Sequence, residues 1–155
     1  MISPEILRRY PFFGDLNSAQ LVEIADITEV AEYPKGTILF KEHQTAIKLY
    51  LLIGGNVELF FTTEEAGSQK FHKELPFGDI NPGEPFGLSA VLDPYILKAS
   101  ARVAQDSKTL EMDAIALRAL FEKNPEIECK LMSQVAKALM SRLTATRIQL
   151  AAAWA

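Results

Sequence analysis

The chain has little of what disulfide scaffolds and metal centres require. Its 155 residues include one cysteine, Cys129, which excludes a disulfide within the chain. A lone cysteine in a helical stretch is typical of a buried or half-buried structural thiol. The two histidines, His43 and His72, have no His-x-His neighbour, whereas a metal-binding cupin needs about three such ligands. We therefore expect no metal site.

Long apolar runs and an excess of basic residues are also missing. No stretch of about 18 apolar residues could span a membrane. Arg8 and Arg9 are followed by Tyr-Pro instead of the apolar core of a signal peptide. The 16 basic and 20 acidic residues give a net charge of −4, which argues against a nucleic-acid partner. We expect a cytoplasmic protein with neither a membrane nor a nucleic-acid partner.

The remaining composition is that of an ordinary globular domain. The apolar fraction is 48% and the charged fraction is 23%. No catalytic triad or paired-carboxylate pattern stands out, so we expect no enzyme. The sequence predicts one domain over residues 1–155, with N-terminal helices at 1–27, a β-roll at 28–112, and a hinge helix and a long helix at 113–155.

The hydrophobic period changes near residue 28. "SPEILRRY" and "NSAQLVEIADI" predict short helices, with Ser3 and either Asn17 or Ser18 as N-caps. Short segments with a period of two follow, separated by Gly and Pro turns. These segments are "TEVAEY", "TILFKE", "KLYLLI", "NVELFF", "KFHKEL", "KASARV" and "KTLEM". They predict a mainly β fold with flanking helices, either an antiparallel sandwich or a jelly-roll barrel.

Helical periodicity returns after Met112. "DAIALRALFEKN" predicts a helix capped by Asp113, and Pro125 opens a long helix. A heptad seam of about three heptads predicts a homodimer through this helix. The seam consists of Met132, Ala136, Leu139, Leu143, Thr146 and Leu150. A second stripe, at residues 127, 131 and 135, could pack on the barrel, and the alternative is one broad apolar face lying on the domain.

Three segments carry a resemblance to a known family. They are "PFFGDLNSAQLVEIADITEVAEYPKGTILFKE", "LYLLIGGNVELF", and "PGEPFGLSAVL" followed by "KASA". In this order the chain resembles the cyclic nucleotide-binding domain family. That domain is the sensor module of catabolite-activator-type regulators, cyclic-nucleotide-dependent kinases and gated channels. The loop pattern and the end of the chain after the long helix look closest to a divergent bacterial stand-alone branch, with no DNA-binding domain.

The resemblance implies a phosphate-binding cassette at residues 86–90 and 98–100. The family pattern is Phe-Gly-Glu-Leu-Ala-Leu, followed by Arg-Ala-Ala or Arg-Ser-Ala. A short helix points N–H groups at the cyclic phosphate, the Glu binds the ribose 2′-hydroxyl, and the Arg pairs with the phosphate. Carried onto this chain, the ligand-binding residues are Phe86, Gly87, Leu88, Ser89, Ala90, Lys98, Ala99 and Ser100.

Beside Ser89, which stands where Leu is usual, three departures from the pattern bear on the ligand. Leu88 stands in place of the Glu, which leaves a buried ribose hydroxyl without its partner at a cost of roughly 1–3 kcal/mol. Lys98 stands in place of the Arg and keeps the charge without the fork geometry. His43 occupies the first turn, where the family has Gly. Affinity for cyclic AMP or cyclic GMP should be strongly lowered or lost, while another small anion could still bind.

Several roles stay open at this point. Lys98 is either an anion ligand or an ordinary solvated lysine. Arg102 lies roughly 13 Å along the strand from Lys98 and is better explained as structural. Ser89 is expected to cap the one-turn helix, and Leu88 to cover the pocket floor, which favours a ligand less polar than a ribose or no ligand. The chain is thus either a regulatory ligand sensor with a degenerate cassette, or a dimeric interaction module that binds no nucleotide.

Overall fold

The computed structural model describes residues 1–64 and 72–155. Two short helices begin the chain, and their caps explain where they start. Ser3 accepts a hydrogen bond from the backbone N–H of Glu5, and Asn17 forms a capping box with Gln20. The predicted cap positions are therefore confirmed, with Asn17 as the second cap. These elements are α1 (Pro4–Leu7), the 3-10 turn η1 (Pro11–Phe13) and α2 (Ser18–Asp26).

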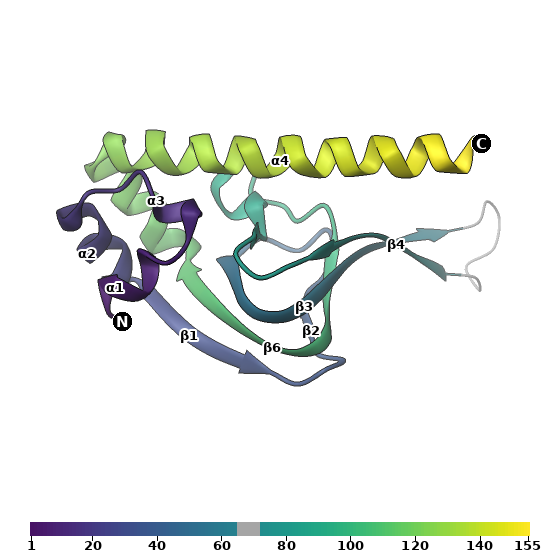
Figure 1. The fold of residues 1–155 in the computed structure, drawn as a ribbon, viewed down its shortest axis with the longest axis horizontal. Coiled ribbons are helices and arrows are strands. Elements are labelled where there is room, and N and C mark those ends of the chain that lie inside the picture. Colours follow the sequence, from purple (N-terminus) through teal and green to yellow (C-terminus); the bar gives the residue numbers. More distant parts are fainter. Residues whose placement is uncertain (65–71) are drawn as a thin grey trace.

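An antiparallel sheet follows in the order β1-β6-β3-β4, with β2 paired to β6 and β5 paired to β3. Its strands are β1 (Thr28–Tyr33), β2 (Ile38–Phe40), β3 (Lys48–Glu64), β4 (His72–Ile80), β5 (Pro85–Phe86) and β6 (Ser100–Asp113). The sheet curls into the predicted jelly-roll architecture, but it is not closed into a full barrel (Figure 1). Most of the predicted turn "EEAGSQ" and the first two residues of the predicted strand "KFHKEL" lie outside the described residues.

Two long strands replace four predicted short ones. β3 runs through the Gly54-Gly55 pair, which the sequence indicated as a turn, and β6 runs through residues 104–107. The pairing of β3 with β6 shifts register between Leu52 and Val57. Bulges of this kind bend a strand without ending it. Gly55 permits the bend because its φ is 91° and an added Cβ would lie 2.2 Å from Ser107 Oγ.

The long strands are buried on both faces, which gives the fold two apolar layers. Leu49, Leu51, Leu110 and Met112 face the helices and belong to the larger core cluster. The alternate residues of β3, together with neighbouring strands, fill the inside of the roll. That inner cluster consists of Tyr50, Leu52, Val57, Leu59, Ile80, Phe86 and Ala101.

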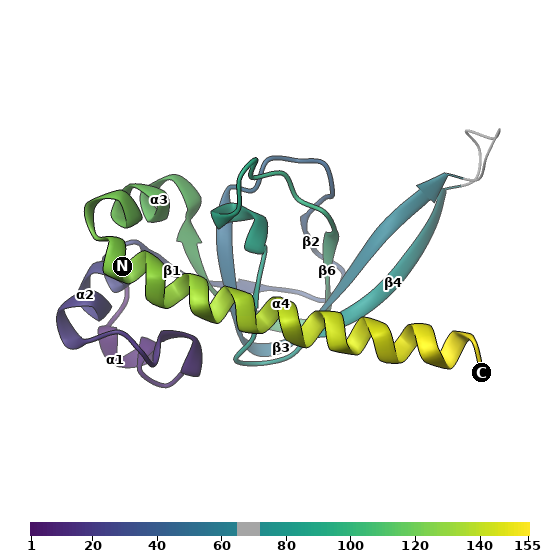
Figure 2. The ribbon, with the colours of Figure 1, turned by 90° about the horizontal axis from the view of Figure 1, so that it is seen from above.

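The C-terminal helices are α3 (Ala114–Lys123) and α4 (Pro125–Ala153). Asp113 caps α3 by accepting from the N–H of Ala116 at 2.9 Å. α4 crosses the whole body, from the N-terminal helices to the β3–β4 hairpin (Figures 1 and 2). Ile127, Leu131 and Val135 are buried against the helical core, which confirms the second stripe. Every residue beyond 142 in this helix is exposed.

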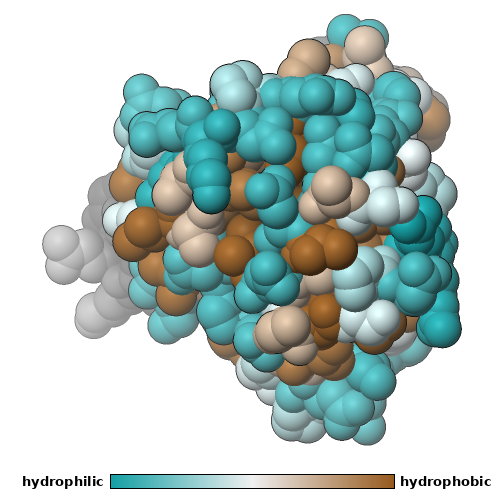
Figure 3. All heavy atoms as spheres, turned by 90° about the vertical axis from the view of Figure 1, so that its left-hand side faces the viewer, coloured by the Kyte–Doolittle hydropathy of each residue, from teal (hydrophilic) through white to brown (hydrophobic). Residues whose placement is uncertain are grey.

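The surface around the N-terminal helices and α3 is mixed in hydropathy. Seen from that end, hydrophobic residues form separate patches broken up by hydrophilic ones (Figure 3). No helix of the described residues is long and apolar enough to cross a bilayer.

One carboxylate is buried inside the roll, and it accepts hydrogen bonds from three side chains. Glu111, 4% exposed, accepts from the Lys48 ammonium at 2.7 Å, the Tyr33 hydroxyl at 2.5 Å and the Thr109 hydroxyl at 2.8 Å. Burial and then this carboxylate raise the pKa of Tyr33 above its ordinary value. The cluster ties β1, β3 and β6 together where they meet.

We expect Glu111→Gln to lower the free energy of unfolding by about 1–3 kcal/mol. The glutamine NH₂ group would face side chains that donate to the carboxylate, and in a buried place these donors would lose their acceptor. Glu32→Gln is the control, since Glu32 lies 3.8 Å from Lys108 with its side chain 77% exposed. That change should stay within about 0.5 kcal/mol. Urea unfolding of the two variants makes the comparison. Equal losses would show that the cluster adds nothing special to stability.

Candidate functional site

The cassette begins where β5 pairs with β3, with Phe86 opposite Tyr50. Gly87 follows in the left-handed region, with φ 68°, and starts the one-turn 3-10 helix η2 (Leu88–Val91). A Cβ at this position would lie 3.0 Å from Tyr50 Cδ2 and 3.2 Å from the Lys48 carbonyl oxygen. The turn therefore needs glycine for both its conformation and its close approach to β3.

Aromatic rings support the cassette from inside the roll. The rings of Tyr50 and Phe86 stack with centroids 4.9 Å apart, and Phe40 lies 5.6 Å from Tyr50 and 6.2 Å from Phe86. Burial, followed by the charge of Glu111, raises the pKa of Tyr50 to about 12. The tyrosine is thus neutral at physiological pH. Its ring packs with those of Phe40 and Phe86 inside the roll, next to the start of the cassette.

A pocket of about 380 Å³ opens between the cassette and α4. On the cassette side its lining includes Gly87, Leu88, Ser89, Lys98 and Ala99. On the helix side it is lined by Leu139, Arg142, Leu143 and Thr146. The pocket is therefore shared by two parts of the chain that are about fifty residues apart.

Most of the predicted ligand residues lie together at this pocket, and the others lie behind it. Phe86, Ala90 and Ser100 are buried and do not line the cavity. Ser100 Oγ accepts instead from the backbone N–H of Glu42 at 3.0 Å. Leu88 is 5% exposed and lines the cavity, as expected of an apolar floor.

Two predictions about single residues need correction. Ser89 was expected to cap the one-turn helix, but Gly87 holds the cap position and η2 has no side-chain cap. The 3-10 helix begins at Leu88, which places Ser89 inside the turn. Cys129 was expected to be buried or half-buried, but it is exposed, because the buried stripe of α4 passes through Ile127 and Leu131.

Lys98 lies in a bend and not in a strand. β6 begins at Ser100, two residues later than the predicted strand "KASARV". The Lys98 side chain lines the pocket yet is exposed. Both interpretations of this lysine, as an anion ligand and as a solvated side chain, therefore remain compatible with its position.

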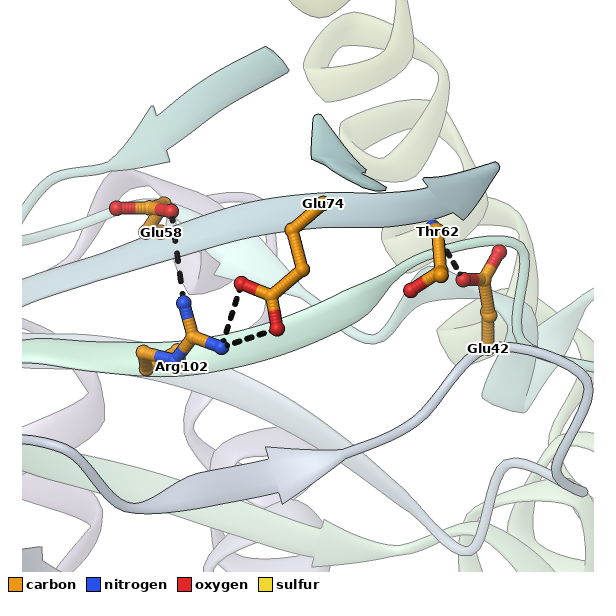
Figure 4. Close-up of polar contacts among 5 residues, drawn as sticks. All are labelled: Glu42, Glu58, Thr62, Glu74 and Arg102. Atoms are coloured by element: carbon orange, nitrogen blue, oxygen red, sulfur yellow. Dashed lines mark hydrogen bonds and ion pairs between the residues drawn. The ribbon is translucent and has the colours of Figure 1, made fainter. Parts of the chain in front are cut away.

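Arg102 is held by the sheet. Its Nη2 donates to both carboxylate oxygens of Glu74 at 2.9 Å, and its Nη1 lies 4.0 Å from Glu58 (Figure 4). The guanidinium also lies 4.4 Å over the ring of Phe60. With two acidic partners and an aromatic face, this arginine fits the structural role that the sequence indicated.

His43 occupies a position that normally favours glycine. Its φ is 71°, in the left-handed region, which agrees with its alignment to the family's Gly. Hydrogen bonds of this residue and of the preceding Glu42 hold the loop in place. The His43 N–H donates to the Leu97 carbonyl at 2.8 Å, and Glu42 Oε1 accepts from the Thr62 N–H at 2.6 Å (Figure 4).

Sequence reasoning missed the arginine that α4 contributes. Arg142 is half-buried and donates to the carbonyl oxygen of Pro85, at the entry to the cassette. Burial lowers its pKa, and the nearby charge of Glu84 opposes that shift. A signal was available, because Arg142 sits between Leu139 and Leu143 and so interrupts the apolar face of the helix with a charge.

A second arginine ties α3 to the cassette. Arg118 Nη1 donates to the Ala90 carbonyl oxygen at 2.7 Å, and its guanidinium lies 4.0 Å over the ring of Tyr95. The carbonyl belongs to η2 and the ring to the loop that follows. Any movement of this loop must therefore move α3 or break both contacts.

Within residues 1–64 and 72–155, no group of three or more His, Cys, Asp and Glu side chains could hold a metal ion.

The family model described as "Cyclic nucleotide-binding domain" matches residues 30–124. The chain belongs to the cyclic nucleotide-binding domain family. Domains of this family are regulatory sensors, and the resemblance seen in the sequence is confirmed.

Relatives of the chain include bacterial proteins and a protozoan kinase. A solved Geobacter metallireducens protein, provisionally named as a cyclic nucleotide-binding protein, is 36% identical with a TM-score of 0.79, covering 92% of this chain and 99% of its own. The CRP-like cAMP-activated global transcriptional regulator of Mycobacterium tuberculosis is 25% identical, over 87% of this chain and 58% of its own. The cGMP-dependent protein kinase of Plasmodium berghei is 29% identical over 75% of this chain and 12% of its own. The chain thus spans little more than half of the curated regulators it matches.

We expect Gly87→Ala to cost more stability than Gly36→Ala. Both glycines have positive φ, 68° and 95°, but only Gly87 has atoms within 4 Å of the added Cβ. Gly36→Ala should therefore lower the free energy of unfolding by about 1–2 kcal/mol from backbone strain alone. Gly87→Ala should add about 1–3 kcal/mol for the crowding against Tyr50 and Lys48. Equal costs in urea unfolding would contradict the close packing of the cassette turn.

Proposed function

We propose that the chain is a regulatory ligand-sensing domain with a degenerate phosphate-binding cassette. The observation that carries the proposal is the shared pocket, which the cassette and α4 line together. A ligand placed there touches both elements, so it binds one relative position of the two better than another. Differential affinity of this kind is what a ligand needs to shift a conformational equilibrium.

Cyclic AMP and cyclic GMP are the reference ligands, because the names of two relatives refer to them. In this chain Leu88 offers the ribose no acceptor, and Lys98 offers the phosphate a point charge instead of a fork. We expect the loss of the acceptor alone to weaken binding by about one to two orders of magnitude. The remaining contacts would come from the backbone of residues 87–90 and from Lys98.

The contacts of Arg118 provide a route from the pocket to the helices. A ligand that orders η2 fixes the Ala90 carbonyl, and through Arg118 it fixes α3. α3 leads directly into α4 at Pro125. The signal would therefore appear as a change in the position or stability of α4.

The output we propose is a homodimer through α4. Leu139, Leu143 and Leu150 of the predicted seam are 43%, 47% and 59% exposed, Ala136 is exposed, and Met132 is half-buried. A second copy of the helix would cover these side chains. Leu139 and Leu143 also line the pocket. Ligand binding and dimer packing would therefore involve the same two side chains. We propose no enzymatic, membrane or nucleic-acid role.

The second candidate is an interaction module that keeps the fold and binds no nucleotide. Leu88 favours this function, since it removes the acceptor for the ribose. The exposure of Lys98 favours it as well, because a solvated lysine gains little from pairing with a phosphate. The two functions differ in whether the pocket responds to any ligand.

A thermal-shift panel with cyclic AMP, cyclic GMP, a cyclic dinucleotide and inorganic phosphate separates the candidates. A ligand at a hundred times its dissociation constant stabilises by about 2.7 kcal/mol, which raises Tm by roughly 5–10 °C in a domain of this size. A rise that disappears in Lys98→Ala would support the sensor. We also expect Leu88→Glu combined with Lys98→Arg to strengthen the cyclic nucleotide response.

The outcome that contradicts nucleotide sensing is equally definite. A flat panel for the natural chain, with a response in the double variant, would mean that the pocket has kept its shape and lost its nucleotide. Matching amide exchange in α4 with and without a ligand that does bind would contradict the proposed output.

A further inference from the structure

Arg142 carries a positive charge into the pocket, and the charge of Glu84 acts on it from outside the pocket lining. Its guanidinium is half-buried and donates to the Pro85 carbonyl. No carboxylate among residues 1–64 and 72–155 forms an ion pair with it. A partly buried charge without a counter-charge is costly. Within the pocket, the guanidinium therefore has no negative charge in direct contact with it.

The rest of the lining is mostly apolar. Leu88, Leu92 and Leu97 face the cavity from the cassette side, and Leu139 and Leu143 face it from α4. No aspartate or glutamate occurs among the described residues of the lining. Burying an apolar body against these walls removes apolar surface from water and is favourable.

Few groups could accept hydrogen bonds from a sugar. The hydroxyls of the described lining belong only to Ser89 and Thr146, and the Thr146 hydroxyl already donates its proton to the Arg142 carbonyl within α4 at 2.8 Å. Leu88 fills the place at which the family pattern has a carboxylate. A ribose bound here would bury hydroxyls without partners, which costs more than leaving them in water.

We propose that the pocket binds an organic anion with an apolar body and no ribose, anchored by Arg142. This inference rests on the proposed sensor function and names its ligand class. The anionic group, a carboxylate or a similar planar anion, lies against the guanidinium, and the apolar body lies between the leucines of the cassette and those of α4. Lys98 at the rim adds a second positive charge that attracts the same class.

Arg142 can hold the anion without releasing Pro85. A guanidinium has five N–H donors in a fixed fork, and the Pro85 carbonyl uses one nitrogen. The remaining donors suit a carboxylate in bidentate geometry. A bound anion would thus join β5, Arg142 and its own apolar body into one connected unit that holds α4 on the cassette.

Isothermal titration of the natural chain with matched probes tests the ligand class. Octanoate has an apolar chain and a carboxylate, octan-1-ol has the same chain without the charge, and acetate has the charge without the chain. We expect octanoate to bind about tenfold or more tightly than either control, and more tightly than cyclic AMP. Octan-1-ol binding as well as octanoate would overturn the role of the charge.

Variants of α4 test the anchor. Arg142→Met should weaken octanoate by about tenfold or more and leave octan-1-ol unchanged. Arg147→Met is the matched control, because Arg147 is exposed on the same helix and does not line the pocket. Equal loss in both variants would mean non-specific attraction to a basic helix. If Arg142→Met does not fold, Arg142→Lys serves, and we expect it to weaken octanoate because the fork is lost.

The remaining outcomes separate this inference from the proposed function. Cyclic AMP bound more tightly than octanoate, in a manner that depends on Lys98 and not on Arg142, would overturn the ligand class and leave the sensor intact. A chain that binds none of the four probes would overturn this ligand class, and it would overturn the sensor as well if cyclic GMP, the cyclic dinucleotide and phosphate also gave no thermal shift.

Discussion

The docking of α4 along the body is the constraint on which the rest of the structure depends. Its first half is fixed by Ile127, Leu131 and Val135, which are buried in the helical core. Because an α-helix is stiff, this docking also sets where the second half lies. The direction carries Leu139, Arg142 and Leu143 across the cassette and closes one side of the pocket. Without that docking the cassette would be an open loop on a curled sheet.

Polar contacts give this apolar arrangement its specificity. Arg142 of α4 donates to the Pro85 carbonyl, and Arg118 of α3 donates to the Ala90 carbonyl. Two arginines from two helices therefore hold the two ends of one short loop. Inside the roll, Glu111 gathers three donors from three strands. Each contact satisfies a group that would be costly to bury alone. Together they make the loop, the helices and the sheet dependent on one another, as a sensor requires.

The sequence predicted the parts that depend on local pattern. Caps at Ser3, Asn17 and Asp113, the opening of α4 at Pro125, and the buried stripe all follow from spacing along one element. The cassette was located because Gly87 and its neighbours follow a known order. What could not be predicted depends on contacts between distant segments. Arg142 bonds a residue 57 positions away, and the merging of four short strands into β3 and β6 depends on bulges that only sheet pairing defines.

The account predicts that α4 holds the cassette in place even before a ligand binds. The most direct test is amide hydrogen exchange at Ala90 and Leu92, whose N–H groups donate to Gly87 and Ser89 at 3.1 Å and 3.2 Å. Exchange at these two amides should be faster in Arg142→Met than in the natural chain or in Arg147→Met, because only the first change removes the contact with Pro85. Equal exchange in all three proteins would show that α4 merely lies beside the pocket, and would contradict the coupling on which the proposed sensor depends.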